Sequence, residues 1–191
     1  MTEGTIVFVD IRGFTQLSEK SGCAEVVNLL NDYFERLVKV VFKYEGVVDK
    51  YIGDALMAAF GTLDHETDSE YRAVAASLEF IEAIEEMNVG RVRDGLEAIK
   101  IGVGVNTGEL LAGFIGSQQR LEYTCIGDTV NTSSRICSMA STNQVLISES
   151  TYRAVKGRVE VESVGLRQFK GKQKEVMVYE AVGMLADGES G

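Results

Sequence analysis

The order of strand-like and helix-like segments constrains the fold of this chain more than any other feature of its sequence. Short apolar, β-branched runs are typical of strands, and longer stretches with apolar residues at helical spacing are typical of amphipathic helices. In chain order, the sequence predicts a strand at 5–9, a helix at 24–44, strands at 47–52 and 55–60, a helix at 70–87 and a strand at 99–105. This β-α-β-β-α-β order predicts an α+β fold with a ferredoxin-like core.

The remainder of the chain predicts a C-terminal αβ extension of that core. It contains strand-like runs at 110–115 and 123–126, a helix opening at 127–129, a strand at 145–148, a short helix at 150–155, and strands at 159–164 and 176–182. The 191 residues correspond to about one domain. We therefore expect a single domain over 1–191, with its core at about 5–182 and a frayed tail at 185–191.

Composition excludes several classes of partner. Hydrophobic residues make up 45% of the chain and charged residues 25%, which is typical of a globular protein. The formal net charge of −10 argues against nucleic acid as a partner, because a protein that binds nucleic acid needs a basic surface. It also argues against direct contact with an anionic membrane. No apolar run approaches the roughly 20 residues of a membrane span. The 3 cysteines are widely spaced and predict neither a disulfide framework nor a zinc site, so we expect a cytoplasmic location.

Two carboxylates are the first candidates for chemistry. Asp10 ends the first predicted strand, and Asp54 lies in the turn of the predicted hairpin. Adjacent antiparallel strands can bring both to one end of the sheet, where paired aspartates suit hard divalent cations. The alternative is that Asp10 caps a helix and Asp54 makes a β-turn, since both are common roles for aspartate.

The loop at 12–15 precedes a helix and can offer the backbone N–H groups of Gly13, Phe14 and Thr15 to phosphate. Asn131 and Arg135 are spaced to share one face of a helix, where an arginine can stabilise a phosphate whose charge grows in a transition state. The alternative for that pair is a solvated helix face.

Lysines provide the remaining candidates. Lys50 follows Asp49 in a strand whose other residues are apolar or aromatic, and a lysine there either protects a sheet edge or donates a hydrogen bond to a ligand. Lys170 and Lys172 flank a glycine in a loop that can hold a polyphosphate. His65 is the only histidine and lies in a polar loop, so we interpret it as a surface residue.

Taken together, four segments resemble the motifs of the class III nucleotidyl cyclases. In chain order they are Phe8 to Thr15, Asp49 to Ala58, Gly102 to Gly108 and Tyr123 to Arg135. The first two resemble the metal motifs of that family, the third its central strand, and the fourth its purine and transition-state segment. Four motifs at compatible spacing are far more specific than any one alone. The resemblance covers nearly the whole chain and implies the class III cyclase fold.

The resemblance also implies an assembly and a metal requirement. Members of the family form head-to-tail dimers with two active sites at the interface, so we expect a homodimer. Each site takes the metal-binding aspartates from one subunit and the purine and transition-state residues from the other. By position, Asp10 and Asp54, with the carbonyl of Ile11, match the ligands of two Mg²⁺ or Mn²⁺ ions.

Substrate roles follow in the same way. Lys50 and Thr124 match the base-recognition pair, Asn131 the ribose-orienting residue, and Arg135 the arginine that stabilises the α-phosphate. Lys172, or else Lys170, matches the lysine that binds the triphosphate.

The lysine–threonine pair is similar to that of a bacterial adenylyl cyclase subclass, which implies conversion of ATP to 3′,5′-cyclic AMP and pyrophosphate. The alternatives are a guanylyl cyclase with unusual base contacts and a catalytically silent dimerisation module. A catalytic domain of this size has no room for a sensor. We therefore expect a sensor domain to lie upstream, in a longer protein of which this chain is a part.

Overall fold

The computed structural model describes residues 1–63, 68–169 and 175–185. Its helices are α1 (Phe14–Lys20), α2 (Cys23–Lys43), α3 (Ser69–Arg93), α4 (Asp128–Met139) and α5 (Glu149–Val155). Its strands are β1 (Thr2–Ile11), β2 (Val47–Ile52), β3 (Ala55–Phe60), β4 (Ile101–Ser117), β5 (Arg120–Ile126), β6 (Gln144–Ser148), β7 (Val159–Arg167) and β8 (Val176–Met184).

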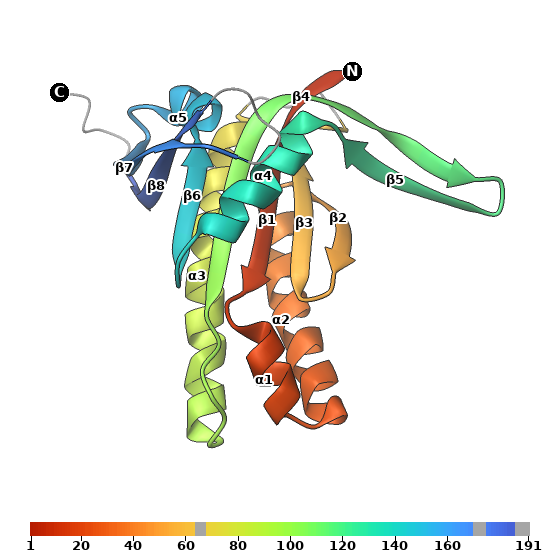
Figure 1. The fold of residues 1–191 in the computed structure, drawn as a ribbon, viewed down its shortest axis with the longest axis vertical. Coiled ribbons are helices and arrows are strands. Elements are labelled where there is room, and N and C mark those ends of the chain that lie inside the picture. Colours follow the sequence, from red (N-terminus) through yellow and green to blue (C-terminus); the bar gives the residue numbers. More distant parts are fainter. Residues whose placement is uncertain (64–67, 170–174, 186–191) are drawn as a thin grey trace.

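One sheet organises the molecule, with strand order β2-β3-β1-β4-β6-β8-β7 and β5 paired to β4 (Figure 1). Strand β1 lies between β3 and β4 and is antiparallel to both. This arrangement of the first four strands confirms the predicted ferredoxin-like core. The parallel pairing of β6 with β4, followed by β8 and β7, forms the C-terminal extension.

The two faces of the sheet are covered differently. Alternate residues of β1 point to opposite faces, so Val7 and Val9 pack in the larger core with α2 and α3, while Ile6 and Phe8 pack in a smaller cluster with Cys137 of α4. Figure 1 shows α4 crossing one face of the sheet, with α2 and α3 behind it.

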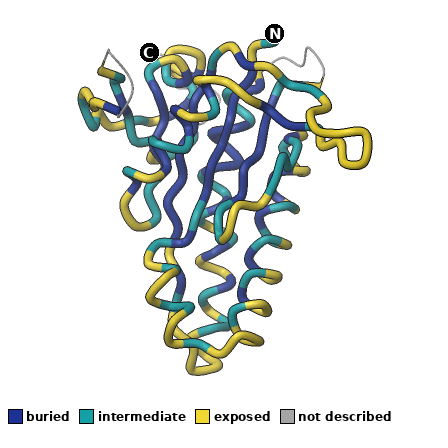
Figure 2. The backbone as a smooth tube through the Cα atoms, turned by 45° about the vertical axis from the view of Figure 1, so that its right-hand side comes forward, coloured by how far each residue is buried: buried dark blue, intermediate teal, exposed yellow. Residues whose placement is uncertain are grey.

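Strand β4 is longer than the sequence predicts. We expected strands at 99–105 and 110–115 with a break between them, but β4 is continuous over Ile101–Ser117. It pairs with the whole of β1, from Thr2 opposite Leu110 to Ile11 opposite Ile101, and this pairing holds the intervening Asn-Thr-Gly segment extended. Its second half forms a hairpin with β5 that projects from the body and is largely exposed (Figure 2).

Two helices also differ from the prediction. Helix α3 continues to Arg93, beyond the predicted end at 87, and the short helix α1 was not predicted. Helix α1 contains no fully buried residue and follows Gly13, whose left-handed backbone (φ 72) turns the chain out of β1. In the described part of the chain, no helix is long and apolar enough to span a membrane.

Candidate functional site

The sheet brings the two predicted carboxylates to one end. Val9 of β1 lies opposite Leu56 of β3, so the end of β1 meets the turn that precedes β3. There the backbone N–H of Ile11 donates to Oδ2 of Asp54 at 3.1 Å. The backbone of one predicted ligand segment therefore orients the carboxylate of the other.

Asp10 is paired with a neighbouring cation. Its carboxylate is partly buried and forms an ion pair with the guanidinium of Arg12. Arg12 also donates from Nη1 to the carbonyl of Ala140, at the C-terminal end of α4, at 3.0 Å. The ion pair therefore connects the end of β1 to the end of α4.

The donor set at this end of the sheet suits a hard divalent cation. Within residues 1–63, 68–169 and 175–185, no three His, Cys, Asp or Glu side chains gather closely enough to hold a metal ion alone. Mg²⁺ is usually held by one or two carboxylates together with waters and substrate phosphates, and two aspartates on adjacent strand ends match that pattern.

The predicted phosphate loop lies at the same end. Gly13 and Thr15 are exposed, whereas Phe14 is partly buried and packs against the core formed with α2 and α3. The loop runs directly from Asp10 and Ile11 into α1, so its backbone lies beside the carboxylate pair.

A second group of polar side chains joins β2 to β5. The ammonium of Lys50 donates to Oγ1 of Thr124 at 2.8 Å, so the predicted base-recognition pair is in direct contact within one chain. Thr124 in turn donates to Oδ1 of Asp49 at 3.0 Å, and the backbone N–H of Cys125 donates to Oδ2 of Asp49 at 2.7 Å.

Asp49 was not among the predicted site residues. Its side chain is only 2% exposed, and the ammonium of Lys50 lies 3.2 Å from its Oδ1. Consecutive residues of a regular strand point to opposite faces, but the register of β2 shifts between Val48 and Lys50, which is a β-bulge. The bulge allows Asp49 and Lys50 to reach the same threonine, and alternation alone gives no signal for it.

Burial and the Asp49 carboxylate both affect Cys125. They raise the pKa of its thiol to about 11, with desolvation the larger cause. Burial likewise raises the pKa of the Cys137 thiol to about 11. Both cysteines are buried in the cluster that supports α4, whereas Cys23 is exposed.

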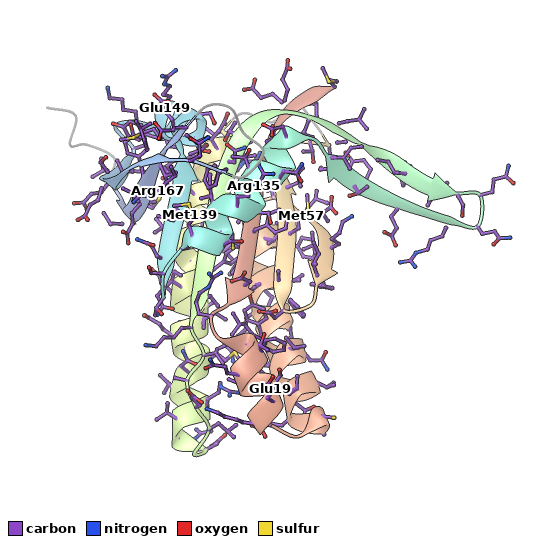
Figure 3. The ribbon with its side chains drawn as sticks, viewed as in Figure 1. Glu19, Met57, Arg135, Met139, Glu149 and Arg167 are labelled. Atoms are coloured by element: carbon purple, nitrogen blue, oxygen red, sulfur yellow. The ribbon has the colours of Figure 1, made fainter. Side chains whose placement is uncertain are left out.

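Helix α4 presents the third group of candidates. Asn131 is exposed and Arg135 partly buried, while Ile136 and Cys137 are buried against the sheet. Figure 3 labels Arg135 on this helix, where it crosses the sheet. Among the described residues, no hydrogen bond or ion pair links Asn131 or Arg135 to the carboxylate pair.

The predicted residues thus fall into separate groups within one chain: the carboxylate end of the sheet, the Lys50–Thr124 contact, and the outer face of α4. Lys170 and Lys172 lie outside the described residues, as does His65.

Comparison with known proteins supports a common family. The family described as "Adenylate and Guanylate cyclase catalytic domain" matches residues 1–181. An adenylate cyclase of Anabaena cylindrica is 36% identical over 188 residues, covering 92% of this chain and 36% of that protein. The chain spans about a third or less of the length of the first three curated relatives that it matches.

Solved structures share the fold. The crystal structure of the guanylyl cyclase Cya2 is similar at a TM-score of 0.94 and 34% identity, covering 98% of this chain and 95% of that one. The adenylyl cyclase CyaB from P. aeruginosa is similar at a TM-score of 0.91 and 32% identity, covering 94% and 93%. The similar structures therefore include enzymes named for either base.

Proposed function

Because this chain belongs to the family of adenylate and guanylate cyclase catalytic domains, we propose that it is an adenylyl cyclase, which converts ATP to 3′,5′-cyclic AMP and pyrophosphate. The observation that carries the choice of adenine is the 2.8 Å contact between Lys50 and Thr124. A lysine can donate to N1 of adenine, and a threonine hydroxyl can accept from its N6 amine. Guanine presents an N1–H instead, which calls for an acceptor such as a carboxylate.

Asp10 and Asp54, together with the carbonyl of Ile11, would hold two Mg²⁺ or Mn²⁺ ions in this proposal. Bound divalent ions lower the pKa of a hydroxyl nucleophile and neutralise the charge of a triphosphate. The hydrogen bond from Ile11 to Asp54 supports the assignment, because it orients one carboxylate beside the other strand end before any ligand arrives.

The remaining candidates act on the nucleotide. The ribose 3′-oxygen attacks the α-phosphorus in line, and pyrophosphate leaves on the opposite side. Asn131 holds the ribose in the attack geometry, and Arg135 supplies positive charge where the transition state gains negative charge. The loop at Gly13, Phe14 and Thr15 would bind the phosphates, together with Lys172 or else Lys170.

The proposed active form is a homodimer with two sites at the interface. The separation of the carboxylate pair from Asn131 and Arg135 within one chain supports it, because a second subunit can bring the groups together. Exposed apolar side chains on the projecting hairpin support it as well. They are Leu111, Phe114, Ile115, Leu121 and Ile126, and Phe114 is 74% exposed.

A guanylyl cyclase is the second candidate, because the similar structures include the guanylyl cyclase Cya2. Turnover of ATP and GTP, each with Mn²⁺, separates the two when cyclic nucleotides are quantified by chromatography. We expect cyclic AMP to be the main product. Preferential formation of cyclic GMP would reject the adenylyl assignment, and absence of both products would indicate a silent dimerisation module.

A further inference from the structure

The hydroxyl of Thr124 is held between a group that can only donate and a group that can only accept. The ammonium of Lys50 donates to Oγ1 at 2.8 Å, and Oγ1 donates to Oδ1 of Asp49 at 3.0 Å. An ammonium has no acceptor site and a carboxylate has no proton to give, so chemistry alone determines the direction of both hydrogen bonds. The Thr124 proton is therefore directed at Asp49.

Asp49 is itself immobilised. Its side chain is 2% exposed, and its second oxygen, Oδ2, accepts from the backbone N–H of Cys125 at 2.7 Å. That backbone donor is held by the pairing of Cys125 with Ala112 in the β4–β5 hairpin. Rotation of the carboxylate away from Thr124 would leave a buried donor unpaired, which is costly.

We propose that Asp49 is the positioning residue that makes this site select adenine. With its proton directed at Asp49, Thr124 can meet a base only as a hydrogen-bond acceptor. The exocyclic N6 amine of adenine can donate to Oγ1 of Thr124. O6 of guanine is an acceptor, so it would face a lone pair of Oγ1 and be repelled. The proposal rests on the proposed function, in which Lys50 and Thr124 contact the base.

The same geometry predicts what Asp49→Asn does. The new carbonyl oxygen stays on the Cys125 N–H, because that backbone donor cannot turn, and the amide group therefore faces Thr124. The ammonium of Lys50, which lies 3.2 Å from Oδ1 in the wild type, is on a flexible side chain and turns away from the amide. The amide donates to Oγ1, and the threonine proton turns outward toward the base. Thr124 then presents a donor, which suits O6 of guanine and opposes the amine of adenine.

The first test measures kcat/KM for ATP and for GTP in the wild-type protein, Asp49→Asn and the control Asp32→Asn. Asp32 lies on α2 and is half exposed. We expect the ATP-to-GTP ratio to fall by about tenfold or more in Asp49→Asn, because one hydrogen bond changes direction. The control should keep the wild-type ratio, and circular dichroism should report the same unfolding temperature for both variants within a few degrees.

The second test removes the amine from the substrate, so it does not depend on the folding of Asp49→Asn. Purine riboside triphosphate lacks the exocyclic amine of ATP. Wild-type protein and Thr124→Ser should prefer ATP over this analogue, and Thr124→Val, which lacks the hydroxyl, should lose most of that preference. Equal kcat/KM for ATP and the analogue in wild-type protein would overturn the inference.

The outcomes separate the inference from the proposed function. If the wild type prefers ATP and Asp49→Asn lowers turnover of both nucleotides equally, Asp49 is only structural, and the inference fails while the adenylyl assignment stands. If the wild type prefers GTP, both fail.

Discussion

Arg135 is the side chain that we propose stabilises the transition state. It lies partly buried on the outer face of α4, and the opposite face of the helix packs on the sheet. A rigid support of this kind keeps a charged group preorganised before the reaction, which is the condition for electrostatic stabilisation of developing charge.

We therefore expect Arg135→Ala to lower kcat by about 10²- to 10³-fold with a much smaller change in KM, because the charge it supplies is needed mainly in the transition state. Steady-state kinetics with ATP and Mn²⁺ measure both constants. Ser138→Ala is the matched control, since Ser138 is exposed on the same helix. A rise in KM with kcat unchanged would contradict the proposed role.

Cysteine chemistry offers a second prediction at this scale. The folded pKa values of Cys125 and Cys137 are raised to about 11, so both thiols stay protonated and unreactive at pH 8. A thiol reagent at pH 8 should label only Cys23 in the native protein and all three cysteines in urea. Labelling of Cys125 at the rate of Cys23, read by mass spectrometry, would contradict the protection of the buried thiols.

The raised pKa values also predict a pH dependence of stability. The free energy of unfolding should fall as the pH rises from 9 toward 11, because the unfolded thiols lose their protons before the folded ones.

Helix α4 is placed by small residues on the strand beneath it. A Cβ atom added at Gly104 of β4 would lie 2.1 Å from the backbone nitrogen of Cys137, so only glycine lets the helix approach this closely. Ser133 of the helix completes the contact, because its one hydroxyl proton is shared between the carbonyls of Ile6 and Gly104, at 2.8 and 2.9 Å from Oγ. The position of Asn131 and Arg135 therefore depends on a glycine in another element.

Gly104→Ala should destabilise the protein by about 1–3 kcal/mol, because α4 must move away from the sheet. It should also lower activity, since α4 carries Asn131 and Arg135. Urea unfolding measures the first effect. Gly113→Ala, in the same strand, is the control, because its Cβ would meet nothing within 4 Å. Equal stability of the two variants would contradict the close contact.

At the scale of the whole molecule, the residues of one proposed reaction lie in separate places on one chain. Asp10 and Asp54 lie at an end of the sheet, whereas Asn131 and Arg135 lie on the outer face of α4. The exposed apolar residues of the β4–β5 hairpin lie on a segment that projects from the body, where a second subunit can cover them (Figure 1). Both features favour a site assembled from two subunits.

Mixing two inactive variants tests this assembly. Asp10→Ala and Arg135→Ala should each be nearly inactive alone, but a heterodimer of the two contains one site with both residues intact. An equal mixture should recover about a quarter of wild-type activity, because half of the dimers are mixed and each has one working site of two. The control is a mixture of Asp10→Ala with Asp54→Ala, which should recover no activity, because both residues belong to the same half of the site. If the mixture of Asp10→Ala with Arg135→Ala also recovers no activity, the proposal of a site shared between two subunits is contradicted.

Local sequence patterns predicted the order of the core elements and placed a carboxylate at the end of β1 and another in the turn before β3. These features are local, because periodicity, β-branching and a Gly-Asp turn depend on neighbours along the chain. Other features follow from contacts between segments that are distant in the sequence. Pairing with β1 makes β4 continuous across a segment that the sequence predicts as a break between two strands. A bulge in β2 turns Asp49 toward Thr124 of a strand that is distant in the sequence. Such features depend on partners far away in the sequence, and no local pattern records which partner a strand or a buried carboxylate will meet.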